Sequence, residues 1–199
     1  MNRRRYPQWW LTLLLLLSAG SAHADPFGVS VQHGYGWTQG EHSGGLTADA
    51  LALVHWNVLR LGATGQFATF LGTGESALGA IAGLGFGDPL QVAVLGEAGM
   101  HHYSGVGSGF LSEDPGADGA LPFAGGKLLM GYRLTRGRRV NVALVSGFSL
   151  NRDLHTLTRH YHYTEIGWLS GNTYDAEETV VIGQTQWTLT LGAAVTWSL

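Results

Sequence analysis

Apolar and small or polar residues alternate one by one over most of residues 27–199. Near the start of this region the apolar or aromatic positions are Phe27, Val29, Val31, His33, Tyr35 and Trp37. At its end they are Trp187, Leu189, Leu191, Ala193, Val195, Trp197 and Leu199. Because successive side chains of a strand point to opposite faces, a period of two predicts two-faced β-strands and not helices.

Six further runs with the same period lie between these two, at residues 46–56, 59–71, 77–87, 90–103, 122–134 and 139–151. Each is close to the roughly 9 to 11 residues that cross a membrane as a tilted strand. The connections 57–58, 88–89 and 135–138 are short, whereas 40–45, 72–76, 104–121 and 152–179 are looser or much longer. This alternation predicts eight antiparallel strands in an up-and-down order.

The two faces of these strands decide between a soluble and a membrane barrel. Only 13% of the residues are charged, against about 25% in typical soluble domains. The non-apolar face consists of Gly, Ser, Thr, Gln and Ala, which suits a narrow lumen better than a solvated exterior. Aromatic residues also gather near both sets of strand ends, as in interfacial girdles. Near the short connections these are Phe27, Trp56, Phe86, Tyr132 and Trp197, and near the long ones Trp37, Phe148 and Trp187. We therefore predict an all-β fold, an eight-stranded antiparallel up-and-down transmembrane β-barrel with its apolar face toward lipid.

The N-terminal segment has the three parts of a secretory signal. Asn2–Arg5 is basic, Trp9–Leu17 is almost wholly apolar, and Ala22-His23-Ala24 supplies the small residues of a cleavage site. The apolar run is too short for a membrane-spanning helix of about 20 residues. We predict a cleaved signal peptide over residues 1–24 and a barrel domain over residues 25–199.

Composition and motifs argue against several other classes. The formal net charge of -3 offers no basic surface for nucleic acid, and the lack of cysteine removes thiol chemistry and disulfides. The glycine-rich stretch 83–87 has no following lysine, so we expect no nucleotide site. We expect no cofactor.

Because of these alternating runs, the chain resembles the small eight-stranded outer-membrane barrels of Gram-negative bacteria, the OmpA/OmpX type. The resemblance covers nearly all of Phe27–Leu199. The resemblance implies an outer-membrane location, contact with lipid and lipopolysaccharide, and insertion by the barrel-assembly machinery, whose signal the last strand resembles. It favours a non-enzymatic envelope-structural or surface-interaction role, with an unknown external ligand. A lipid A-modifying hydrolase and a small-solute conduit stay open as alternatives.

Charges are unevenly distributed along the expected connections. Arg60, Arg133, Arg136, Arg138 and Arg139 lie near the short turns. The expected external loops contain only two basic residues, Arg152 and Arg159, but many acidic ones: Glu41, Glu75, Glu113, Asp114, Asp118, Asp153, Glu165, Asp175, Glu177 and Glu178. We expect an acidic outer rim, which keeps the loops solvated or, alternatively, binds divalent cations at the lipopolysaccharide surface.

Two groups of residues are candidates for chemistry, although we expect no catalytic or metal site. His102 and Ser104 share a lipid-facing parity, similar to the histidine and serine of outer-membrane lipid A deacylases. Their third member would have to come from Glu75, Glu113 or Asp114. Separately, the longest loop contains His155, His160 and His162, which could ligate zinc or copper.

One ion pair is expected inside the barrel. Glu97 and Lys127 lie on neighbouring strands and both have inward parity. Placing 97 opposite 127 would also place Tyr103 opposite Leu121. We therefore predict a luminal Glu97–Lys127 ion pair, against the alternative that water, Gln66 or Asn141 satisfies each residue separately.

Overall fold

A computed structural model describes residues 27–40, 44–70, 73–106, 117–135, 137, 139–166 and 173–199. The predicted signal peptide, residues 1–24, lies outside them. The described strands are β1 (Phe27–Gln39), β2 (Gly44–Trp56), β3 (Leu59–Phe70), β4 (Thr73–Phe86), β5 (Leu90–Val106), β6 (Ala117–Arg133), β7 (Val140–Asp153), β8 (Leu157–Ile166), β9 (Thr173–Ile182) and β10 (Thr185–Ser198).

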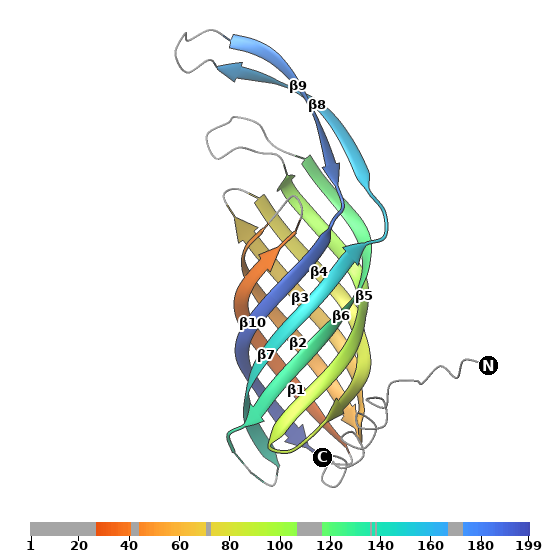
Figure 1. Ribbon diagram of the computed structural model, residues 1–199, viewed down its shortest axis with the longest axis vertical. Helices are drawn as coiled ribbons and strands as arrows, with labels where there is room; N and C mark the ends of the chain where they lie inside the picture. The colour runs from red at the N-terminus through yellow and green to blue at the C-terminus, as the bar shows by residue number, and fades with distance from the viewer. Residues whose placement is uncertain are drawn as a thin grey trace, which may run out of the picture.

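Eight of these strands close into an antiparallel barrel in the order β1-β10-β7-β6-β5-β4-β3-β2 (Figure 1). Closure is direct, because β1 pairs with β2 on one side and with β10 on the other, from Gly28 opposite Ser198 to Gln39 opposite Trp187. The ring therefore leaves no strand edge unpaired, as lipid requires. The predicted fold class is confirmed. No helix in the described part of the chain is long and apolar enough to span a membrane.

The alternation assigns the two faces as predicted. On β10, Leu189 and Leu191 are 54% and 67% exposed, whereas Thr190 between them is 5% exposed. Exposed apolar side chains continue around the barrel, among them Tyr35, Leu78, Val94, Leu128 and Leu144. A continuous apolar belt of this kind is unfavourable in water and suits the hydrocarbon of a bilayer.

Most of the expected girdle aromatics lie on the outer surface. Those near the short turns that are exposed are Phe27, Trp56, Tyr132 and Trp197, and those near the long connections are Trp37, Phe148 and Trp187. Phe86 differs, because it is half-buried and borders a pocket in the lumen.

Among the short turns, the β2–β3 turn begins at Asn57 with a φ of 55°. This is a left-handed conformation that Asn tolerates better than most residues.

Residues 152–179, expected as a long loop, are not one. They include the end of β7, all of β8 and most of β9, and β8 pairs with β9 from Leu157 opposite Ile182 to Ile166 opposite Thr173. This two-stranded sheet projects beyond the barrel from the connection between β7 and β10 (Figure 1). We refer to β8 and β9 together as the external hairpin.

Several barrel strands also extend farther toward the long connections than the alternation indicated. β4 starts at Thr73 instead of Ala77, and β6 starts at Ala117 instead of Pro122. Backbone pairing continues past the apolar belt, where lipid no longer selects for apolar side chains. Residues assigned to loops are consequently brought into the barrel wall.

Candidate functional site

The barrel lumen contains a polar, an apolar and a charged layer, which the inward residues of β2 and β5 follow. From the short-turn end toward the long connections, the inward residues of β2 are His55, Leu53, Leu51 and Asp49. Those of β5 are Gln91, Ala93, Leu95 and Glu97. Each of these two strands therefore contributes a polar residue, then apolar residues, then a charged residue. The apolar layer is a buried cluster of Leu51, Leu53, Ile81, Leu95, Leu129, Ala143, Val145 and Ala194.

The charged layer contains one ammonium group and two carboxylates. Lys127 Nζ lies 3.1 Å from Asp49 Oδ2 and 3.9 Å from Glu97 Oε2. All three side chains are buried. Asp49 Oδ1 and Glu97 Oε1 have no hydrogen-bond partner among the described residues. The geometry thus places both residues of the predicted pair together, but Asp49, which sequence reasoning missed, is nearer to the ammonium group.

The register used to predict that pair is wrong. Lys127 lies opposite Leu95, Glu97 opposite Gly125, and Tyr103 opposite Gly119 instead of Leu121. The pairing is displaced by two residues, which preserves the inward parity of both charges. Asp49 has the same inward parity as Leu51 and Leu53, so parity was the signal that could have identified it.

A dense hydrogen-bonded network fills the end of the lumen near the long connections. Asp153 Oδ1 lies 2.8 Å from His101 Nδ1, and Asp153 Oδ2 accepts hydrogen bonds from Tyr103 Oη at 2.5 Å and from the Gln184 backbone N–H at 2.9 Å. Glu75 accepts from the amides of Gln184 and Gln186, at 3.0 and 2.5 Å. These acids are therefore fully engaged with donors.

Apolar contacts surround this network. Phe123 stacks on the His101 ring with the ring centroids 4.3 Å apart. A Cβ at Gly79 would lie 3.3 Å from Phe123 Cζ, so glycine leaves room for the ring. Tyr103, Leu121 and Ile182 form a buried cluster against which Leu157 packs. The base of the external hairpin thus helps to seal this end of the barrel.

Two members of the expected acidic rim are corrected by this network. Glu75 and Asp153 are buried in the lumen, not exposed in loops. The reason is that β4 and β7 extend through them with inward parity. Asp118 and Glu177 are exposed, as are Arg152 and Arg159. Glu41, Glu113 and Asp114, together with the side chains of Glu165, Asp175 and Glu178, lie outside the described residues.

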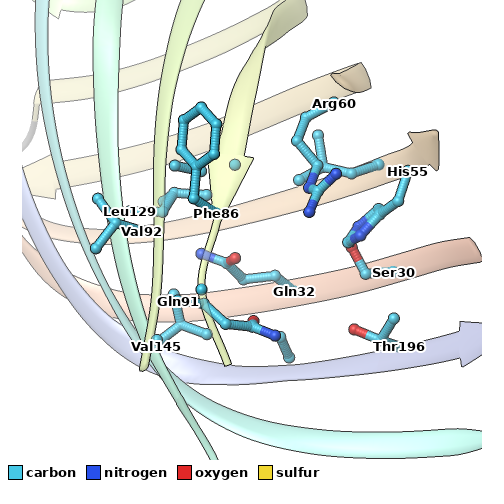
Figure 2. Close-up of a pocket in the computed structure, with 16 residues that line it drawn as sticks. Ser30, Gln32, His55, Arg60, Phe86, Gln91, Val92, Leu129, Val145 and Thr196 are labelled. Carbon is cyan, nitrogen blue, oxygen red and sulfur yellow. The ribbon is translucent and has the colours of Figure 1, made fainter. Parts of the chain in front are cut away.

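A pocket with polar and apolar walls occupies the opposite end of the lumen, beside the short turns (Figure 2). Its volume is about 60 Å³, and the residues that border it include Ser30, Gln32, His55, Arg60, Gln91 and Thr196. Ser30 Oγ lies 2.5 Å from His55 Nε2. Arg60 Nη1 donates to the backbone carbonyls of Asn57 and Leu59, at 2.6 and 2.8 Å. Sequence reasoning placed Arg60 near a turn but did not assign it to the lumen.

The two candidates for hydrolytic chemistry face away from the lumen. His102 and Ser104 are exposed on the outer face of β5. Glu75 is buried on the inner face of the neighbouring strand, so it cannot act as their third member. Glu113 and Asp114 lie outside the described residues. The described residues thus provide a histidine and a serine without an oriented carboxylate among the expected candidates.

The three histidines considered as candidate metal ligands are spread over the external hairpin and its base. His155 is exposed in the connection between β7 and β8. His160 and His162 lie in β8, opposite Thr179 and Glu177. His160 Nδ1 is 2.8 Å from Thr179 Oγ1, and the His162 side chain lies outside the described residues. No group of three or more potential metal ligands occurs among the side chains that the structure describes.

Strand closure and the exposed apolar belt together define a small eight-stranded transmembrane β-barrel. No protein-family model matches the chain, and no curated protein matches it. Among solved structures, the chain is similar to Neisserial surface protein A (NspA), with 16% identity and a TM-score of 0.49 over 87% of this chain and 97% of that one. It is also similar to the β domain of the Bordetella autotransporter BrkA, with 11% identity and a TM-score of 0.43 over 88% and 100% of the two chains.

Proposed function

We propose that this protein is a non-enzymatic barrel of the bacterial outer membrane, with an envelope-structural or surface-interaction role exerted through its external hairpin and acidic loops. The observation that carries the proposal is the projection of β8 and β9 beyond a barrel whose adjoining lumen is filled (Figure 1). A two-stranded sheet has unpaired backbone groups along both outer edges, and such edges can pair with an extended partner.

The expected partners follow from the membrane location. The apolar belt would contact lipid, the outer rim would contact lipopolysaccharide, and divalent cations could bridge acidic side chains to it. We expect the predicted signal peptide to direct export and the barrel-assembly machinery to insert the chain. We expect the external hairpin to bind the external ligand, whose identity is unknown.

The alternatives have less support. The hydrogen-bonded network at one end and the buried apolar layer farther in leave little free volume for a passing solute. A lipid A hydrolase would need a carboxylate to orient His102, and Glu75 points to the opposite face of the sheet. Neither activity is needed to explain the external hairpin.

Orientation can be tested with an inserted epitope. Placed at His155, which is exposed at the base of the hairpin, the epitope should bind antibody on intact cells. The matched control carries the same epitope between Asn57 and Val58, in a short turn, and should bind only after the outer membrane is permeabilised. The reverse pattern would contradict the proposed role of the hairpin at the cell surface.

The role of the hairpin can be tested by removing it without disturbing its base. Because Leu157 lies opposite Ile182, residues 158–181 can be replaced by an Asn-Gly turn. Closed barrels resist detergent until boiled, so the variant should still migrate differently before and after boiling. With folding verified in this way, cells with the variant should resemble cells without the protein in surface adhesion and dye exclusion. Full function in the variant would contradict the proposal.

Two measurements separate the alternative classes. Mass spectrometry of lipid A should give identical species with and without expression, and a missing acyl chain would indicate a hydrolase. Planar bilayers should show no steady conductance, and reproducible channels would indicate a conduit.

A further inference from the structure

Arg60 is a half-buried cation whose described hydrogen-bond partners are all neutral. Its guanidinium points into the pocket at the short-turn end of the lumen (Figure 2). Its hydrogen bonds go through Nη1 to two backbone carbonyls. The ion pairs among the described residues do not include Arg60, and no carboxylate side chain borders the pocket. A partly desolvated cation of this kind favours a negatively charged partner.

The acids of the lumen are separated from Arg60 by the apolar layer. Leu53, Leu129, Val145 and Ala194 belong both to that layer and to the pocket lining. Asp49 and Glu97 lie on the far side of it, since Leu51 and Leu95 come between them and the pocket on their own strands. The apolar side chains of this layer therefore keep the two carboxylates away from Arg60. An anion that balances Arg60 would therefore enter from the short-turn end.

The wall of the pocket is shaped to hold the guanidinium over the cavity. A Cβ at Gly85 would lie 2.9 Å from Arg60 Nε and 3.2 Å from Arg60 Cζ, so any larger residue would displace the group. Gln32 and Gln91 add amide donors, and Ser30 and Thr196 add hydroxyls around the same cavity (Figure 2). A cation beside several neutral donors, with apolar residues forming the rest of the wall, is an arrangement that can bind a small oxyanion.

We propose that this pocket is a binding site for a small soluble oxyanion, of the phosphate or carboxylate class, with Arg60 as its principal contact. This site goes beyond the proposed surface role and does not depend on it. The volume of about 60 Å³ corresponds to several water positions at roughly 10 to 15 Å³ each, which is enough for phosphate or acetate. Because the pocket is inside the closed ring of strands, the bilayer does not reach it, and a soluble anion is the source that fits.

Calorimetric titration of the folded, detergent-solubilised protein with inorganic phosphate tests the site, at constant ionic strength and with acetate in a parallel titration. Saturable binding is expected for at least one of them. Arg60→Gln keeps hydrogen-bonding capacity but removes the charge, and should weaken binding at least about tenfold, as expected for a charge-assisted hydrogen bond. Arg139→Gln is the matched control, because Arg139 is an exposed cation at the same end that does not border the pocket; it should bind as the wild type does.

A second variant tests the geometry without altering charge. Gly85→Ala should displace the guanidinium and also weaken binding, and different migration of boiled and unboiled samples verifies that each variant is folded. Equal affinity in the wild type and Arg60→Gln would overturn the proposal, as would equal weakening by Arg139→Gln. Absence of saturable binding of both phosphate and acetate into the millimolar range would overturn it too.

Discussion

The two ends of the lumen differ in how their charged side chains are paired. Near the long connections, Asp153 and Glu75 receive hydrogen bonds from four side chains and one backbone N–H, and an apolar cluster closes over them. Near the short turns, the described hydrogen-bond partners of Arg60 are neutral carbonyls beside a cavity. The first end gains rigidity from complete pairing, whereas the second retains the capacity to bind a ligand.

The charged layer between the ends shares features with both. Lys127 has two carboxylate neighbours, as at the closed end, yet Asp49 Oδ1 and Glu97 Oε1 have no hydrogen-bond partner among the described residues. Two carboxylates against one ammonium group leave this layer with an excess of acid. Substitutions in the different layers should therefore lower the free energy of unfolding by different amounts.

The largest effect is expected at Lys127. Lys127→Met leaves two buried carboxylates without their cation and should reduce the free energy of unfolding by about 3 to 5 kcal/mol, as for other broken buried pairs. Urea unfolding in lipid vesicles measures it. Double-mutant cycles with Asp49→Asn and Glu97→Gln should give the larger coupling for Asp49, because its oxygen is closer to Nζ (3.1 against 3.9 Å). Zero coupling to both acids would show that these residues are satisfied separately.

The outer face of the barrel provides the next contrast. Leu191→Arg or Leu189→Arg, near the middle of the bilayer, should lower the free energy of unfolding by about 2 to 4 kcal/mol. Thr190 points inward. The effect of Thr190→Arg on stability should therefore depend on crowding and on charge pairing in the lumen, not on contact with lipid. Environment-sensitive fluorophores at 189 and 191 should report lipid. If they report water and a probe at 190 reports lipid, the faces are inverted.

At the closed end, Asp153→Asn should cost about 1 to 3 kcal/mol, because it removes the charge from an acceptor shared by His101, Tyr103 and Gln184. The matched control is Arg152→Gln, on the adjacent exposed residue, which should change stability by less than about 0.5 kcal/mol. Equal unfolding free energies for the two variants would mean that the network does not stabilise the barrel.

The wall of the barrel could be predicted from the sequence because lipid imposes a strict rule on it. Every second residue must be apolar, and a one-residue slip would reverse both faces. Side-chain direction was therefore predictable for Glu97, Lys127 and Thr190. Register was not, since a shift of two residues keeps parity, and the predicted placement of Glu97 opposite Lys127 was displaced by that amount.

The external hairpin escaped prediction for a related reason. Residues 157–166 are rich in Thr, Tyr and His, which suit strands, but neither parity is consistently apolar. Outside the membrane no lipid enforces the alternation on which the prediction depended. The same limit hid Glu75 and Asp153, whose strands continue beyond the apolar runs. The pocket required three-dimensional closure, because Ser30, Arg60 and Gln91 come from three different strands.

The smallest effect is expected at the open end, where Arg60→Gln should change the unfolding free energy by no more than about 1 kcal/mol in the absence of added anion. The variant loses two hydrogen bonds to carbonyls but also removes a cation that no described acid compensates, and these terms oppose each other. Phosphate at ten times the wild-type dissociation constant should then stabilise the wild type by about 1.4 kcal/mol and the variant, whose binding is weakened at least about tenfold, by no more than about 0.4 kcal/mol. Unfolding curves with and without phosphate, at matched ionic strength, measure both quantities. A cost as large as that of Asp153→Asn without phosphate would mean that Arg60 already has a partner of comparable strength, and the contrast between the two ends of the lumen would disappear.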